Sequence, residues 1–468
     1  MTRAVVALLA IACALPATAA RAQSPDDQES RLGSEFRREG EAIGDNCSHI
    51  ASVIGCATTF VTGEPMHISV GSIAPGNGLG AGPAFVWHST PSDDWRISGS
   101  ADAVFTPGGS WRLGTYATFV RTAMPDSGIG IRIHPYPVLK AYAQATSLAT
   151  LPYFGIGSDT LRGDKAIFGL RETIVGSQVV WPVTADAIDR LNISLLAEVN
   201  GRAVKVMGAP SGTSDPSIEQ RYTDATAPGL SAQPGAVQLG EGVRFAPSVL
   251  GSRLRFNYRV WFQQFAASSG DASFQRWTVD LRHEIPVFGS SAPAARDTNS
   301  PNECSIGPTS PGECPKVAWS DTSINRTGSL TLRALLSRSV VSGASAVPFY
   351  FQQTLGGSDL DGNRVLASYD DYRFRGPHLL LFQETFEHSL FGLPIGLWLS
   401  ADQGRVGAQG EALTFTGLRH SETIGLSFRA GGLPVALLTY STGGPEGHHV
   451  ALTLSPTLGG GSSRPALQ

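Results

Sequence analysis

The sequence predicts an all-β protein, a single transmembrane antiparallel β-barrel of about sixteen strands with one extracellular loop folded inward. Three observations lead to this class. Segments in which apolar and polar residues alternate recur along the chain, as half-buried strands require. The chain has 54 glycines and 30 prolines, which suits many turns, and only 16% of its residues are charged. After the N-terminal segment, no stretch approaches the roughly 18–20 apolar residues that a spanning helix needs.

The chain opens with the pattern of a secretory signal peptide. Met1–Arg3 is short and basic, Ala4–Ala20 is apolar, and Ala20-Arg21-Ala22 offers the small residues of a cleavage site. We therefore expect residues 1–22 to be removed and the protein to be exported. Residues 23–65 are then a short periplasmic N-terminal arm or a partial plug, with a flexible tail as the alternative.

Residues 66–456 carry the alternation expected of a barrel. In the clearest segment, 253–264, one face takes Leu254, Phe256, Tyr258, Val260 and Phe262, and the other takes Arg253, Arg255, Asn257, Arg259, Trp261 and Gln263. A soluble sandwich can also alternate. It rarely places three arginines on one face of a strand whose other face is apolar throughout.

About sixteen strands are expected, and an even number returns both ends of a barrel to the periplasm. The ranges are 66–72, 79–89, 94–105, 111–122, 136–147, 165–180, 190–203, 252–266, 274–286, 326–340, 346–355, 378–388, 394–404, 419–430, 433–441 and 448–456. With the first strand running outward, the long connections fall on the extracellular side: 148–164, 204–251, 287–325, 356–377 and 405–418. Residues 457–468 form a C-terminal tail.

Four cysteines remain after the signal peptide, as two local pairs. Exported proteins meet oxidising conditions, where such pairs usually close. We expect a disulfide between Cys304 and Cys314, in the 287–325 extracellular connection. Cys47 and Cys56 are the other candidate pair, and the sequence leaves open whether they are bonded. A zinc site is the rival interpretation, but it needs four converging ligands.

The 356–377 connection concentrates two arginines and three aromatic rings within 369–376. Such residues suit a loop that folds into a polar lumen, where guanidinium groups meet carboxylates and ring faces. Alternation along 394–404 places Trp398, Ser400 and Asp402 on one face, so Asp402 is a candidate acceptor in that lumen.

These segments carry a family resemblance, listed in chain order: Leu355-Gly356-Gly357-Ser358, Leu366-Ala367-Ser368-Tyr369, Arg373-Phe374-Arg375-Gly376 and Asp402-Gln403-Gly404-Arg405-Val406. Their order and spacing resemble the C-terminal barrel of BamA/TamA-type outer-membrane proteins, the bacterial surface antigen family. The resemblance implies an outer-membrane barrel, and the N-terminal arm is too short for the usual periplasmic domains of that family. It also implies a lumen loop and lock made of Tyr369, Arg373, Phe374, Arg375, Gly376, Asp402 and Gly404.

One departure from the family pattern changes the expected contacts of the lock. Where the family carries an arginine that meets the aspartate matched by Asp402, this chain has Ala367-Ser368. We therefore expect Arg373 or Arg375 to reach Asp402 instead, with Tyr369 packed beside the pair.

The sequence contains no Gly-x-Ser-x-Gly elbow, phosphate loop or zincin helix. We therefore expect no enzyme activity, no catalytic residues, no metal and no cofactor. A net charge of −4 gives no basic footprint for nucleic acid. The resemblance implies insertion or translocation of outer-membrane proteins by a monomer in outer-membrane lipid, with client proteins or periplasmic partners. A passive or gated pore for small solutes and a structural surface antigen are the alternatives.

Overall fold

The structure is a computed structural model, and the residues that it describes are 65–92, 94–121, 137–183, 191–249, 254–288, 328–343, 345–359, 363–390, 395–430, 433–444 and 446–454. The chain divides into two compact units, Met1–Cys56 and Ala57–Gln468, and every described residue belongs to the second. The signal peptide, nearly all of the 23–65 arm, the 457–468 tail and the cysteines Cys47, Cys56, Cys304 and Cys314 lie outside the described residues. Within those ranges, no helix has the length and apolar character needed to cross a membrane.

The described unit is built on one sheet, which confirms the all-β prediction. It has 17 strands, and because β9 (Ser248–Val249) has only two residues, sixteen long strands form the wall. These are β1 Met66–Ser72, β2 Leu79–Ser92, β3 Trp95–Phe105, β4 Trp111–Arg121, β5 Val138–Tyr153, β6 Ala166–Pro182, β7 Ile193–Gly208, β8 Ala236–Phe245, β10 Leu254–Ala267, β11 Phe274–Phe288, β12 Gly328–Val340, β15 His378–Ser389, β16 Ile395–Gly407, β17 Arg419–Ala430, β18 Leu433–Thr442 and β19 His449–Leu454.

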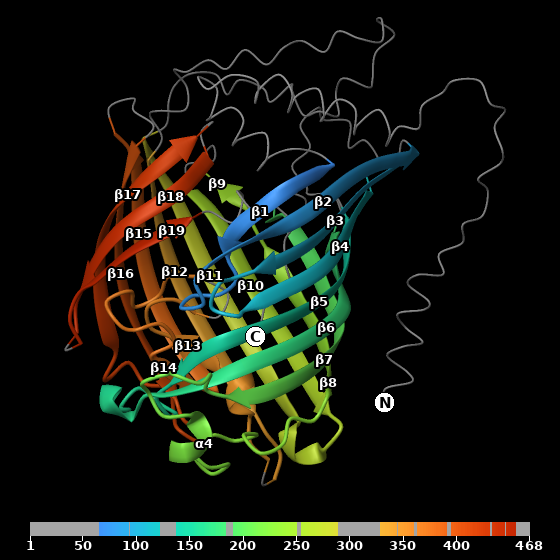
Figure 1. The fold of residues 1–468 in the computed structure, drawn as a ribbon. Helices are drawn as coiled ribbons and strands as arrows, with labels where there is room; N and C mark the ends of the chain where they lie inside the picture. Colours follow the sequence, from blue (N-terminus) through green and yellow to red (C-terminus); the bar gives the residue numbers. More distant parts are fainter. Residues whose placement is uncertain are drawn as a thin grey trace, which may run out of the picture. The chain divides into compact units, whose positions relative to one another are not determined.

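Each wall strand pairs antiparallel with the next one along the chain, so the sheet is an up-and-down meander. The strands curve into a barrel wall (Figure 1). β1 pairs with β2 and β19 pairs with β18, but across the described residues no hydrogen-bonded register joins β1 to β19. The sheet is therefore not closed.

The barrel has two ends, which we name by what lies there. At the terminal end β1 begins and β19 finishes, and the β15–β16 and β17–β18 turns also lie there. At the loop end lie the β5–β6, β7–β8, β12–β15 and β18–β19 connections. The β7–β8 connection includes the short helix α4 (Ile218–Arg221), which is at the lower end in Figure 1.

The strand number was predicted correctly, but two of the assignments were wrong and cancelled each other. Residues 236–245, placed in a loop by the sequence, form β8. Its inward face carries Gly240 and Gly242, which resemble loop glycines. Both are needed because the Trp261 ring lies over them: an added Cβ would come within 2.7 Å of that ring at Gly240 and 2.4 Å at Gly242.

The second wrong assignment is the wall strand expected at 346–355. Phe349–Phe351 is a 3₁₀ turn, η7, and Gln353–Leu355 is a short strand, β13, that pairs with β14 (Phe374–Gly376) apart from the wall. The run is apolar but not alternating, and a short apolar run of this kind does not distinguish a wall strand from another buried segment.

Because of these two errors, the predicted directions of the strands between them, β10, β11 and β12, were opposite to the observed ones. The connection from β11 to β12 therefore leaves from the terminal end, because Phe288 pairs with Gly328 and Gly328 pairs with His388 at that end. The prediction that this connection lies on the same side as 356–377 was wrong. Cys304 and Cys314 belong to that connection in the sequence.

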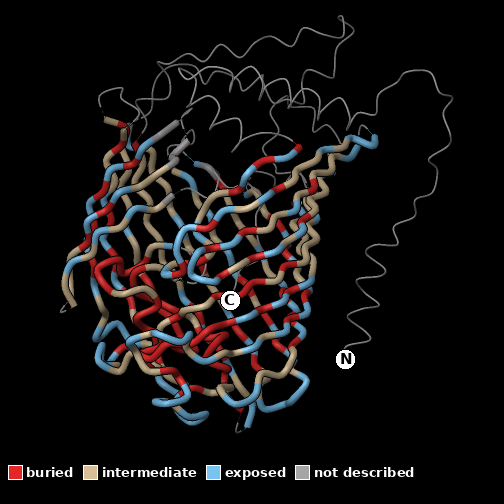
Figure 2. The backbone as a smooth tube through the Cα atoms, in the orientation of Figure 1, coloured by how far each residue is buried: buried red, intermediate tan, exposed pale blue. Residues whose placement is uncertain are grey.

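The wall has an apolar outer face and a polar inner face. Leu195, Val199 and Val260 point outward and are 42–50% exposed. Arg259, on the other face of β10, lines an internal cavity. This confirms the alternation predicted for 253–264. Buried segments gather toward the loop end, where α4, β13 and β14 lie (Figure 2).

Candidate functional site

The connection between β12 and β15, residues 341–377, folds into the lumen and is named here the plug. Its hairpin of β13 and β14 lies inside the wall (Figure 1). Leu355, Leu366 and Phe374 of the plug are almost fully buried, and they pack in one cluster with Leu381 of β15 and Val406 of β16. The sequence-based prediction of an inward loop is therefore confirmed.

An aromatic cluster anchors the first part of the plug. Phe349 packs edge-on against Tyr153 of β5 and Phe168 of β6, with ring centroids 5.2 and 5.1 Å away. Phe351 lies 5.4 Å from Phe265 of β10. The two edge-to-face contacts of Phe349 add roughly 0.5–1.5 kcal/mol each beyond the burial of apolar area. Several strands of the wall therefore hold the base of the plug.

Arg373 attaches the tip of the plug to two rim connections. Its guanidinium forms an ion pair with Glu446 of the β18–β19 connection, at 2.7 Å, and the side chains are 2% and 12% exposed. The same group donates hydrogen bonds to the hydroxyl and the carbonyl of Thr160, at 2.8 and 2.7 Å. It also lies over the rings of Phe154 and Phe374, 4.8 and 4.7 Å from their centroids. We call Arg373, Glu446 and Thr160 the clamp.

A second ion pair supports the clamp at the rim. Arg162 donates two hydrogen bonds to the Asp370 carboxylate, at 2.8 and 3.0 Å. The Arg162 side chain is 53% exposed, so solvent weakens this pair relative to the Arg373 pair. Asp370 is three residues before Arg373, and both connect the plug to the β5–β6 connection.

Arg375 is 1% exposed and enclosed by aromatic rings. It donates one hydrogen bond, 2.8 Å long, to the carbonyl of Phe349, and lies within 6.0 Å of the ring centroids of Tyr153, Phe168 and Phe349. No carboxylate in the described ranges forms an ion pair with it, and burial lowers the pKa of its guanidinium to about 10. Arg375 therefore ties the two halves of the plug together and does not act as an acid-pairing lock.

The predicted contact between Asp402 and Arg373 or Arg375 is wrong. The Asp402 carboxylate accepts hydrogen bonds from the backbone N–H of Leu366, at 3.0 Å, and from the Ser400 hydroxyl, at 2.8 Å. Leu366 has a φ of 48°, in the left-handed region, at the residue whose N–H donates to Asp402. Asp402 therefore fixes the plug through a backbone amide immediately before Ala367, the position where the resemblance implies an arginine.

The other predicted residues lie beside these contacts. Tyr369 and Phe374 pack edge-on with ring centroids 5.0 Å apart, and both are buried. A Cβ at Gly376 would lie 2.6 Å from the carbonyl oxygen of Gly407, and one at Gly404 would lie 2.9 Å from that of Leu380. Both glycines therefore allow close backbone approach between the plug, β15 and β16.

Several residues that hold the plug were not among the predicted site residues, among them Thr160, Glu446 and Arg364. Glu446 is one acid in a glycine-bearing turn, and no short-range pattern links it to Arg373, 73 residues away. Arg364 reaches β19 through a 3.5 Å hydrogen bond to the Thr453 hydroxyl. Burial raises the pKa of the Asp371 carboxyl, and the positive charge of Arg364 partly opposes this rise.

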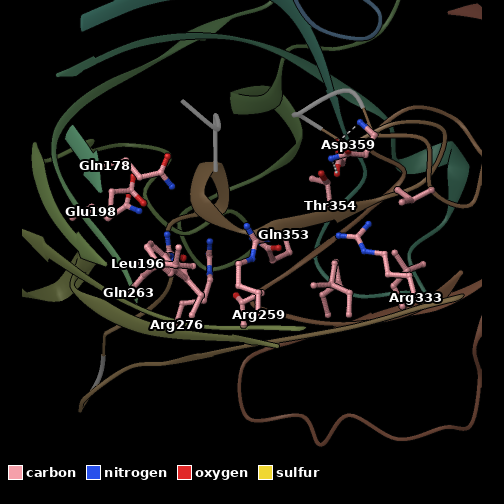
Figure 3. A pocket seen from close by; sticks show the side chains of 18 of the residues that line it. Gln178, Leu196, Glu198, Arg259, Gln263, Arg276, Arg333, Gln353, Thr354 and Asp359 are labelled. Atoms are coloured by element: carbon pink, nitrogen blue, oxygen red, sulfur yellow. Dashed lines mark hydrogen bonds between the residues drawn. The ribbon is translucent and has the colours of Figure 1, made fainter. Parts of the chain in front are cut away.

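On the side of the plug toward the terminal end lies a polar cavity of about 350 Å³, named here the chamber. Its wall is formed by inward residues of strands from β5 to β15, and β13 covers it from the plug (Figure 3). The chamber carries arginines from four strands: Arg202 of β7, Arg259 of β10, Arg276 and Arg282 of β11, and Arg333 of β12.

Comparison with known proteins gives structural matches only. No protein-family model and no curated protein matches the chain. Similar solved structures include CdiB from Acinetobacter baumannii (9% identity, TM-score 0.46, 83% of this chain and 58% of that one). They also include BamA from Haemophilus ducreyi lacking POTRA domains 1–3 (11%, 0.47, 82% and 68%) and CdiB from Escherichia coli (13%, 0.48, 83% and 61%). The chain thus spans less than two thirds of either CdiB, and family membership stays a prediction.

Proposed function

We propose that this protein is an outer-membrane β-barrel of the BamA/TamA type that inserts or translocates other proteins. The observation that carries the proposal is the seam between β1 and β19. Both strands present an edge for which the described residues show no partner strand. An open edge beside lipid leaves N–H and C=O groups without partners, which costs several kcal/mol per group in hydrocarbon. A client strand that pairs there satisfies those groups.

The outer face supports a place in a lipid bilayer. Apolar side chains on alternate residues point away from the lumen on strands around the wall, including Leu239, Leu336, Ile424 and Leu438 at 40–53% exposure. Trp95 and Trp181 lie at the terminal end, and Trp277 lies toward the loop end. Tryptophan at both ends fits the two interfaces of a membrane. We infer that the loop end faces outward from the cell.

Two measurements in living cells test the assembly function. Deleting the gene should lower the amounts of other outer-membrane proteins. A photocrosslinking residue at Ile68 of β1 should capture newly exported barrel proteins. The same residue at Val175 of β6 should not, because β6 is paired on both sides. The two positions are matched in exposure, at 44% and 36%. Equal capture at both positions, or unchanged protein amounts, would count against the seam.

A gated pore is the second candidate, and the chamber beside the plug favours it. The polar lumen already encloses solvent-sized space, and the plug closes it at the loop end. In planar bilayers the wild-type protein should then show rare, brief openings. Deleting residues 358–371 should give a large, steady conductance. If the 358–371 deletion gives no conductance, and the gene-deletion strain has normal amounts of outer-membrane proteins, both candidates fail and a structural role is favoured.

A further inference from the structure

Three arginines in the chamber share one aspartate. The Asp280 carboxylate lies 2.8 Å from the guanidinium of Arg333, 3.1 Å from that of Arg282 and 3.6 Å from that of Arg259. We name these four residues the arginine cluster. None of the three arginines forms an ion pair with any other carboxylate in the described ranges. The cluster therefore has three positive charges and one negative charge, an excess of two.

The sheet register places like charges directly opposite one another. Arg282 faces Arg333 across β11 and β12, and Arg259 faces Arg244 across β10 and β8. Like charges in directly opposite positions destabilise a sheet. The folded chain keeps this arrangement on the inner face, where Arg259 and Arg282 are still 48% and 45% exposed. Such a cluster is stabilised when an anion binds to it.

The plug supplies a polar cover above the cluster. Gln353 and Thr354 of β13 line the same chamber as Arg259, on the side that the plug forms (Figure 3). Thr354 is 3% exposed and lines the chamber, and its hydroxyl has no hydrogen-bond partner among the described residues. A buried hydroxyl of this kind needs a partner, and it can donate to an oxyanion.

The carboxylates that line the chamber do not neutralise this excess. Glu198 accepts hydrogen bonds from Asn200, at 2.6 Å, and from Tyr142, at 3.2 Å. Asp359 accepts from the side chain of Asn363, at 2.9 Å. Neither acid forms an ion pair with Arg259, Arg282 or Arg333, whose ion-pair partner is Asp280.

We propose that the chamber is a binding site for a small phosphate-bearing solute. Guanidinium groups hold phosphate oxygens through paired, charge-assisted hydrogen bonds, and two excess charges match a phosphate dianion. Arg259 and Arg282 contact the solute, Arg333 keeps Asp280 in place, and the Thr354 hydroxyl donates from the plug. A volume of 350 Å³ admits a pyrophosphate or a small phosphate ester and excludes a protein segment.

The test is calorimetric titration of the full-length protein in a neutral detergent, with inorganic pyrophosphate and with sodium chloride at equal ionic strength. Pyrophosphate should bind saturably and chloride should not. The double variant Arg259→Gln/Arg282→Gln should lower the affinity about tenfold or more, the loss expected when charge-assisted hydrogen bonds are removed. If this variant fails to fold, Arg259→Gln alone should still weaken binding about threefold.

The matched control is Arg255→Gln. Arg255 lies on the same strand face as Arg259 and is 51% exposed, but it has its own acid partner, Glu284, at 3.2 Å. Its loss should change the affinity less than about twofold. An absence of saturable binding by the wild type, or an equal loss in the control, would overturn the proposal. Short-chain phosphatidic acid that competes with pyrophosphate in the same micelles would assign the site to a lipid headgroup and not to a soluble solute.

Discussion

Arg373 shows how one side chain can hold a plug of more than thirty residues in place. It contacts the β5–β6 and β18–β19 connections at once, through Thr160 and Glu446. Both partners of the ion pair are nearly buried, so solvent screens it little. Removing one partner of such a pair leaves a charge without compensation, which costs roughly 3–5 kcal/mol.

We therefore expect Arg373→Ala and Glu446→Ala each to loosen the plug, and the double variant to be little worse than either single one. Hydrogen exchange of the plug amides measures the free energy of opening, and the cycle should give a coupling close to the cost of one single variant, about 3 kcal/mol or more. Combining Arg373→Ala with Asp402→Ala is the control. These residues share no hydrogen-bond partner, so their effects should add to within about 0.5 kcal/mol. Strong coupling between Arg373 and Asp402 would contradict the observed contacts.

Asp371 gives the plug a dependence on pH. Burial raises the pKa of its carboxyl above the ordinary 3.8, although Arg364 and hydrogen bonds from Ser358 oppose this. Between the pKa of Asp371 in the unfolded chain and its higher pKa in the folded protein, the folded protein binds more protons than the unfolded chain. Stability therefore falls as pH rises through that window. Asp371→Asn should flatten this part of the urea-midpoint profile between pH 3.8 and neutral pH. Identical slopes in the variant and the wild type would exclude the effect.

At the residue scale, the sequence predicted the inward loop and the burial of its residues but not their partners. Arg373 and Arg375 are recognisable as lumen residues because solvated loops rarely carry arginines between aromatic rings. Glu446 and Thr160 are not recognisable, because they meet Arg373 only after the barrel brings its rim connections together. Asp402 was identified correctly as an acceptor, but its donor is a backbone amide. Every residue except proline has such an amide, so no sequence pattern marks it.

Among the elements, β8 and β10 fit together through two glycines and a tryptophan. The Trp261 ring occupies the space where side chains at Gly240 and Gly242 would lie. Alternation alone identified the strands rich in valine, leucine and arginine. It did not identify β8, because the reason for its glycines is a ring on the neighbouring strand.

This fit predicts a difference between two glycine-to-alanine substitutions. Gly240→Ala should destabilise the barrel by about 1–3 kcal/mol, because the new methyl group overlaps the Trp261 ring. Gly201→Ala, on the adjacent strand β7, should be nearly neutral, because nothing lies within 4 Å of the added Cβ. Urea titration followed by heat-modifiable gel migration measures both. Equal stability of the two variants would mean that Trp261 moves aside freely.

For the whole molecule, the strand order decides which connections share a side of the membrane. With β8 in the wall, the β7–β8 and β11–β12 connections lie at opposite ends of the barrel. A protease-cleavable tag inserted after Gly212 should be cut on intact cells, and one inserted after Asn299 only after the outer membrane is permeabilised. Cleavage of both tags on intact cells would instead support the topology predicted from the sequence, in which both connections are extracellular.

The clamp also has a consequence for the order in which the chain folds. Every wall pairing joins strands that are neighbours along the chain, so the sheet can grow strand by strand from either side. The plug contacts are of another kind: Arg373 to Thr160 spans 213 residues, Arg162 to Asp370 spans 208, and Arg373 to Glu446 needs the β18–β19 connection. Contacts of long sequence separation form late, because the chain must lose its loop entropy before they are made. We therefore expect the lumen of this barrel to stay open while the wall assembles, and the clamp to be completed only after the last strands are in place.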